Sequence, residues 1–239
     1  SRLDSRLTLL GKVDRFAQQE EARANRDAKA VSVFREKAFS MMASPAVKRA
    51  FNIQSEKPTL RDRYGRTSFG QSCLMARRLV ESGVRCVTIN HVDWDTHDNN
   101  FVSLKRDLLP QLDMAMSTLL DDLSDRGLLQ QTLVVVTGEF GRSPKISRSD
   151  NGSKGLRYGR EHWPGAMSVL VCGGGMDHGQ VVGSTNSLGE HPDERPLTPN
   201  DLWATVYKHL GIDQNATILD HTGRPQFILP FGKPIAELL

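Results

Sequence analysis

This sequence of 239 residues lacks several features that would assign it to a membrane, secreted or disulfide-rich class of protein. No stretch approaches the ~20 consecutive apolar residues that a membrane-spanning helix needs, and no signal peptide opens the chain. Cysteine is scarce, since the three residues Cys73, Cys86 and Cys172 lie far apart in apolar or small-residue surroundings. This spacing argues against a disulfide framework or a cysteine-ligated zinc site, and it predicts buried free thiols.

The sequence also lacks an excess of one charge. It has 31 basic and 28 acidic residues, a formal net charge of +3, and the basic residues are scattered among acidic ones. That distribution gives little reason to propose nucleic acid as the main partner. With 38% apolar residues the chain can still bury a full core, so one domain, or a large piece of one, is the default expectation.

Helical periodicity dominates the first quarter of the chain. Apolar residues recur there in two similar stripes, formed by Leu7, Leu10, Val13, Phe16, Val31, Phe34, Ala38 and Met41. Ser44 and Pro45 then mark the start of another helix, as N-cap and first helical residue. We therefore predict that residues 1–60 form a helical region or cap that contains no strand.

Strand-like and helical segments alternate in the rest of the chain. Strands are predicted at 84–90, 132–140 and 166–175, and helices at 67–83, 102–127 and 198–212. The middle helix has one apolar face, formed by Leu108, Leu112, Ala115, Leu119 and Leu123. Because strands that alternate with helices usually form parallel sheets, the predicted fold is α/β, with a mostly parallel central sheet flanked by helices.

Polar residues that can bind a metal follow two of the predicted strands. "HVDWDTH" comes directly after the first strand, and "TGEFGR" comes at the end of the second. A long loop then returns to the third strand through "GREHWPG". Because ligands gather beyond the carboxyl ends of parallel strands, we expect Asp95, His97, Glu139 and His162 to converge at one sheet edge.

These four residues have the chemistry of a metal site. Imidazole and carboxylate together favour zinc over calcium, with manganese or iron as alternatives to zinc, and no cysteine is placed to supply a thiolate. Asp93 offers an alternative carboxylate or a ligand for a second ion, and Arg142 and Arg160 could neutralise an anionic substrate through bidentate hydrogen bonds. The set suits a hydrolase of phosphate or sulfate esters, in which a metal activates the nucleophile and stabilises the leaving oxygen.

Each of these residues also has a purely structural interpretation. Asp95 or Asp98 could cap the helix that follows, and Glu139 could form a structural ion pair. His162 could be a packed loop histidine beside Trp163. The glycine-rich stretch "CGGGMDHG" lacks the Lys and the Ser or Thr of a phosphate-binding loop, so it is interpreted as a turn.

Five motifs carry a family resemblance: "WDTHDNNF", "TGEFGRSPKI", "GREHWPGAMSVLVCGGG", "GQVVGST" and "RPLTPNDLWATVYKHLGID". In this order they resemble the bacterial, planctomycete-type family catalogued as domain of unknown function 1501, over roughly residues 65 to 239. That family is grouped with the alkaline phosphatase and sulfatase enzymes. The resemblance therefore implies an alkaline phosphatase-like three-layer sandwich with a two-metal site.

The resemblance also implies roles for single residues. Asp95 and His97 match a first pair of ligands, Glu139 matches the acidic member of a second pair, and His162 matches a late histidine. Phe140 stands where the related enzymes have the histidine of the second pair, so one ligand is missing.

Related proteins open with a signal sequence, a first strand and a Ser or Thr nucleophile, none of which this chain contains. Residues 61–239 are therefore interpreted as the C-terminal part of an alkaline phosphatase-like α/β domain, and no nucleophile is assigned. The resemblance implies an exported, periplasmic location.

The sequence leaves three functions open. The first is a metal-dependent hydrolase of phosphate or sulfate esters on a small molecule or a polysaccharide. The second is a non-catalytic relative that binds a metal or another ligand in an exported or cell-surface assembly. The third is a purely structural use of the same residues, and the sequence gives no indication of the oligomeric state.

Overall fold

The computed structural model describes residue 8 and residues 33–40, 44–150 and 155–239. The chain divides into two units, Ser1–Asn52 and Ile53–Leu239, which are described separately. In the first unit, residues 33–40 are helical and α3 (Pro45–Phe51) follows, with Pro45 at its start as the sequence predicts. Ser44 occupies the N-cap position, but its side chain makes no capping hydrogen bond. Of the predicted stripe, Leu7, Leu10, Val13, Phe16, Val31 and Met41 lie outside the described residues.

The second unit contains most of the helices. They are α4 (Pro58–Arg63), α5 (Ser68–Glu81), α6 (Asn100–Ser103), α7 (Leu109–Asp125) and α8 (Pro199–His209). A π-helical turn (Leu104–Leu108) joins α6 to α7, and short 3-10 turns cover Ile53–Ser55, Leu129–Gln131 and Ala236–Leu238. Within the described residues, no helix combines the length and the apolar character needed to cross a membrane.

Local sequence signals set the ends of these helices. The Thr67 hydroxyl accepts a hydrogen bond from the Gly70 amide at the start of α5, and the chain leaves the helix at Gly83 with a φ of +93°. At the start of α8, Thr198 and Asp201 cap each other's backbone amides in a capping box. The helices that the sequence predicted at 67–83 and 198–212 are confirmed by α5 and α8.

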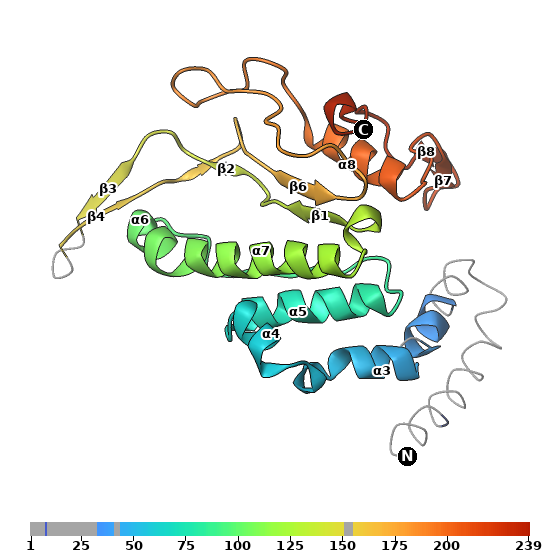
Figure 1. Ribbon diagram of the computed structural model, residues 1–239. Coiled ribbons are helices and arrows are strands. Elements are labelled where there is room, and N and C mark those ends of the chain that lie inside the picture. Colours follow the sequence, from blue (N-terminus) through green and yellow to red (C-terminus); the bar gives the residue numbers. More distant parts are fainter. Residues whose placement is uncertain (1–7, 9–32, 41–43, 151–154) are drawn as a thin grey trace. The chain divides into compact units, whose positions relative to one another are not determined.

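The hydrophobic core of this unit lies between α5 and α7, which run side by side (Figure 1). Its buried members are Tyr64, Phe69, Cys73, Leu74, Ala115, Leu119 and Leu123. The apolar stripe predicted for the helix at 102–127 is confirmed, since Leu108 is also buried and Leu112 packs against the core. The expectation of buried thiols holds for Cys73 but is wrong for Cys86, which is exposed.

A network of ion pairs runs through the same helix pair. The Arg77 side chain is only 1% exposed and lies 2.8 Å from Glu56, 2.7 Å from Glu81 and 2.8 Å from Asp122. The Tyr64 hydroxyl donates a hydrogen bond to Asp122 at 2.9 Å. Arg77 has three carboxylates within 2.8 Å, and these opposite charges are what allow its guanidinium group to be buried.

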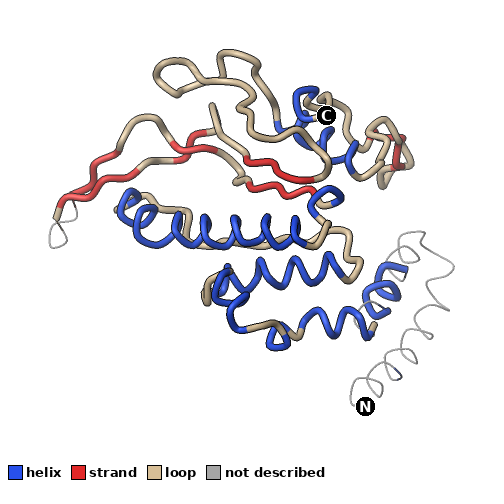
Figure 2. Tube along the Cα trace, in the orientation of Figure 1, coloured by secondary structure: helices blue, strands red, loops and turns tan. Residues whose placement is uncertain are grey.

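The described strands form four two-stranded sheets, and every pair is antiparallel. The pairs are β1 (Leu133–Val136) with β6 (Leu170–Gly173), β2 (Gly141–Arg142) with β5 (His162–Trp163), β3 (Ser147–Asp150) with β4 (Leu156–Gly159), and β7 (Thr217–Leu219) with β8 (Pro225–Phe227). The first three pairs follow one another, so the chain leaves along β1, β2 and β3 and returns along β4, β5 and β6. Figures 1 and 2 show this as a long ribbon whose β1–β6 end runs alongside α7.

The predicted mostly parallel central sheet, and with it the three-layer sandwich, is wrong: the fold is mixed α and β with small antiparallel sheets. Parallel pairing needs a crossover connection, usually a helix, and the described residues between β1 and β6 contain none. The segment 84–90 is not a strand either, because no described segment supplies a hydrogen-bonded ladder for it. Its alternation is still visible in burial, since Val84, Val87 and Ile89 are half-buried between exposed neighbours.

Candidate metal centre

Three side chains that can bind a metal meet on the surface of the second unit. The Asp95 Oδ1 atom lies 2.9 Å from His97 Nε2 and 2.7 Å from His162 Nε2. The two imidazole rings are 4.7 Å apart between centroids. Among the described residues this is the one group of three or more such side chains whose ligand atoms all lie close together, within 4.8 Å of one another.

The segment that carries Asp95 and His97 has no regular secondary structure and is held by its side chains. The His91 ring stacks on Phe69 of α5 at 3.9 Å between centroids, with the rings 11° from parallel, and it meets Trp94 edge-on. The buried Asn100 at the start of α6 donates to the Thr96 hydroxyl at 2.5 Å. Phe69 of the core and Asn100 of α6 thus hold the two ends of the segment, and Asp95 between them is exposed.

The β-ribbon approaches this segment through a glycine. Gly159, the last residue of β4, is buried, and a Cβ atom at this position would collide with the backbone carbonyl of His97. The ribbon then continues into β5, where His162 pairs in register with Arg142 of β2. A residue without a side chain is therefore needed for His162 to reach His97.

Arg142 joins the two segments that contribute ligands. Its guanidinium group donates to the carbonyl of Trp94 at 2.7 Å and to that of Arg160 at 2.9 Å, and it lies 3.4 Å from Asp95 Oδ1. Arg160 in turn donates to the carbonyls of Ser143 and Pro144. The two arginines predicted to bind an anion thus hold the backbone around the site in this conformation.

Charge shapes the protonation of the cluster. The hydrogen bonds from His162 and His97 lower the pKa of the Asp95 carboxyl. The Glu161 carboxylate accepts from His97 Nδ1 at 2.7 Å and, with Asp95 on the other ring nitrogen, raises the pKa of His97 above its usual 6.5. His97 therefore lies between two carboxylates, an arrangement that favours its protonated form when no metal is bound.

The other residues predicted for the site are placed differently. Glu139 is exposed, in the turn between β1 and β2, and is not a member of the group formed by Asp95, His97 and His162. Asp93 is also exposed and outside that group, and its backbone has a left-handed φ of +72°.

The structural alternatives also differ from what is observed. The N-cap position before α6 is Asn99, not Asp95, and Arg142 forms its ion pair with Asp95 instead of Glu139. The His162 ring packs against Phe140, with 4.5 Å between centroids. Glu161 was not foreseen from the sequence, although its place directly before His162 in "GREHWPG" is a signal that could have identified it.

The donor set fits a divalent ion. Donor atoms at 2.0 to 2.2 Å from a tetrahedral metal lie about 3.4 Å from one another. The hydrogen-bonded distances of 2.7 and 2.9 Å would need to open by about 0.7 and 0.5 Å to reach that separation, and all three ligand atoms already lie within 4.8 Å of one another. The side chains of Asp95, His97 and His162 are 72%, 40% and 44% exposed, so an ion can enter from solvent.

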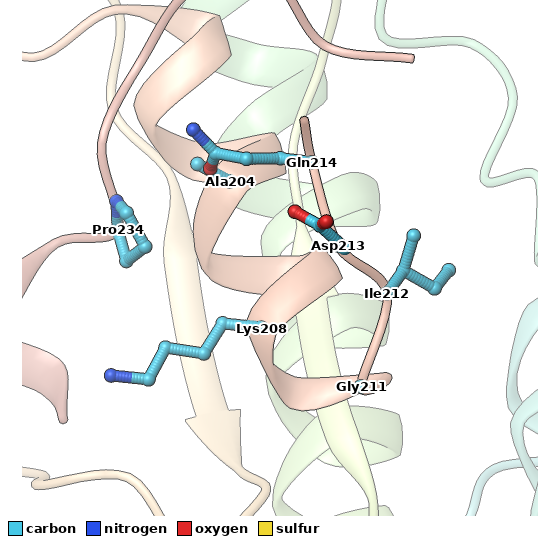
Figure 3. A pocket seen from close by; sticks show the side chains of 7 residues that line it. All are labelled: Ala204, Lys208, Gly211, Ile212, Asp213, Gln214 and Pro234. Atoms are coloured by element: carbon cyan, nitrogen blue, oxygen red, sulfur yellow. The ribbon is translucent and has the colours of Figure 1, made fainter. Parts of the chain in front are cut away.

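The cluster lies outside the cavities that the structure contains near α8 and α5. One cavity of about 390 Å³ lies at the end of α8, lined by Ala204, Lys208, Gly211, Ile212, Asp213, Gln214 and Pro234 (Figure 3). Another, of about 340 Å³, lies between α5 and residues 87–90. No residue of the metal cluster lines either cavity.

Comparison with known proteins gives one match. The model of a family described as "Protein of unknown function (DUF1501)" covers residues 1–239. No curated protein and no solved structure matches the chain.

Proposed function

The chain belongs to the DUF1501 family of proteins of unknown function, and for this member we propose a metal-dependent hydrolase of phosphate or sulfate esters. One observation carries the proposal: two imidazoles and one carboxylate from distant parts of the chain meet at one exposed point. Zinc sites that perform catalysis commonly have three protein ligands and keep a fourth position for water or substrate. The cluster of Asp95, His97 and His162 has that composition.

The proposed metal is a divalent ion, zinc in the first place, with manganese or iron as alternatives. When bound, such an ion would supply a Lewis acid to an ester oxygen. The side chains of Asp95, His97 and His162 would hold it, while Arg142 and Arg160 keep the two contributing segments together and place positive charge beside the site. Glu139 and Asp93 stay predictions as further ligands, and no nucleophile is assigned to this chain.

The proposed relation to alkaline phosphatase and sulfatase enzymes rests on the motif resemblance and concerns the ligand residues, not the sheet. The proposed export from the cytoplasm has the same basis. The substrate class, a phosphate or sulfate ester on a small molecule or a polysaccharide, follows from the metal together with the neighbouring arginines.

The test combines metal content with turnover. Elemental analysis and zinc titration should give one ion bound per chain in the wild type, and His162→Ala should lose most of the binding. Hydrolysis of an aryl phosphate or aryl sulfate should require the ion and fail in the same variant. A wild-type protein that neither contains nor takes up a divalent ion would contradict the proposal.

A second candidate is a relative that binds the metal without catalysis. It is favoured by the position of the cluster on an open surface, outside both cavities described above, since a substrate would have few walls to orient it. Metal binding without turnover of either ester would support this second function.

A further inference from the structure

We propose that Glu161 is the positioning residue of this metal site: it holds the Nδ1 proton of His97 so that Nε2 is presented to the ion. The inference rests on the proposed metal site and names a residue that the proposed ligand set does not contain. It begins from the two ring nitrogens of His97, which have different partners. The Nε2 atom faces Asp95 at 2.9 Å, and the Nδ1 atom faces Glu161 at 2.7 Å.

Only one of these nitrogens can be the metal ligand. Nε2 lies 2.9 Å from Asp95 Oδ1, the oxygen that His162 Nε2 also contacts at 2.7 Å, whereas Nδ1 faces Glu161. A histidine that coordinates through Nε2 must lose its proton there and keep the one on Nδ1. The Glu161 carboxylate is the acceptor for that remaining proton, so it fixes both the tautomer and the rotation of the ring.

Glu161 is itself held firmly enough for this role. Its backbone amide donates to the Ser143 hydroxyl at 3.0 Å, and its carbonyl accepts from the Ser143 amide at 2.8 Å. These contacts hold the backbone of Glu161 against the residue that follows β2, whereas His97 belongs to the segment before α6. The hydrogen bond from His97 to Glu161 therefore joins the two segments in addition to the bonds that Arg142 makes and the bond between His162 and Asp95.

The side chain of Glu161 can be changed without removing its backbone bonds to Ser143. Glu161→Leu deletes the acceptor, whereas Glu161→Gln keeps a carbonyl oxygen that can accept the Nδ1 proton but carries no charge. Loss of a carboxylate behind a metal-bound histidine typically lowers metal affinity 10- to 100-fold. We expect that range for Glu161→Leu and a smaller loss for Glu161→Gln. Glu194→Leu, which removes an exposed carboxylate outside the cluster, should bind zinc like the wild type.

The experiment is a zinc titration by calorimetry on the full chain, for the wild type, the three variants above and His97→Ala. It is combined with nitrogen-15 NMR of the His97 ring. The zinc-bound wild type should show a protonated Nδ1 and a coordinated Nε2. In Glu161→Leu the low-field signal of the Nδ1 proton should be lost both with and without zinc. Its circular dichroism spectrum should match that of the wild type.

The outcomes separate the two proposals. Equal zinc affinity of wild type and Glu161→Leu would overturn the role of Glu161 and leave the metal site intact. A loss in Glu161→Gln as large as that in His97→Ala would make Glu161 a ligand and also overturn the positioning role. No zinc binding by the wild type would overturn the proposed function together with this inference.

Discussion

Replacing the buried Arg77 with Met should destabilise the second unit by about 3 kcal/mol, because removing one partner of a buried ion pair leaves uncompensated charge and costs 3 to 5 kcal/mol. The low end is expected for a structural reason. Each carboxylate around Arg77 keeps one other partner: Asp122 keeps Arg126 and Tyr64, Glu56 keeps Arg78, and Glu81 keeps Arg126. Three carboxylates would then share two arginines, so one negative charge stays uncompensated. The Arg77 Nε atom also lies 2.8 Å from Asp122 without the alignment of a hydrogen bond. Met is chosen because its unbranched chain occupies much of the space of the arginine stem.

The assay is urea unfolding followed by circular dichroism, with the free energy extrapolated to water. Arg63→Met is the matched control, because Arg63 of α4 also pairs with an aspartate of α7, Asp121, at 3.1 Å, while both side chains are more than half exposed, at 54% and 63%. Exposed ion pairs contribute 0 to 1 kcal/mol, so the control should unfold within that range of the wild type. If the free energies of unfolding of Arg77→Met and Arg63→Met differed by less than about 1 kcal/mol, burial of the charge network would not matter for stability and the reasoning would be refuted.

Three further changes test the site and the fold. Zinc affinity should fall as the pH is lowered, because protons compete with zinc for His97. Glu161 and Asp95 raise the pKa of His97, so the pH at which half of the zinc affinity is lost should lie above 6.5. A value below 6.5 in a calorimetric pH series would contradict this. Gly159→Ala should weaken zinc binding and cost about 1 to 3 kcal/mol of stability, because its Cβ atom would displace the backbone of His97; unchanged affinity and melting temperature would show that the close approach is not needed. Thr198→Ala should cost about 1 kcal/mol through the loss of the α8 cap, with metal affinity unchanged, and an effect on zinc binding would mean that α8 and the cluster are coupled.

The helices could be predicted from the sequence because their signals are local. Thr67, Gly83 and Thr198 lie at the ends of the ranges predicted for two helices, and the apolar stripe from Leu108 to Leu123 faces the core. The sheet could not be predicted because strand pairing depends on segments far apart in the chain. Val134 of β1 pairs with Cys172 of β6, and the direction of that pair is set by the helix-free connection between them. The alternation of strands and helices carried no information about that connection.

The site was predicted for a reason that the structure does not support. Asp95, His97 and His162 come together, but they do so because an antiparallel ribbon turns back past the segment before α6, and not at the end of parallel strands. The same premise placed Glu139 beside these residues; the structure has it exposed in the turn between β1 and β2, outside the group of three, and its role as a further ligand stays a prediction. Glu161 was missed because its contact with the Nδ1 atom of His97 depends on the fold, and its place directly before His162 was the one signal in the sequence that pointed to it.

The separation of the ligands along the chain has a consequence for how this unit unfolds. Asp95 and His162 are 67 residues apart in sequence, and α7 lies between them. An ion bound to both would act as a reversible cross-link between two distant segments of the folded chain. Zinc present at 100 times its dissociation constant would add about 2.7 kcal/mol to the folded state if the unfolded chain does not bind it. The β-ribbon could then separate from the segment before α6 only after the ion had dissociated. The free zinc concentration would therefore govern how fast proteases cleave the ribbon.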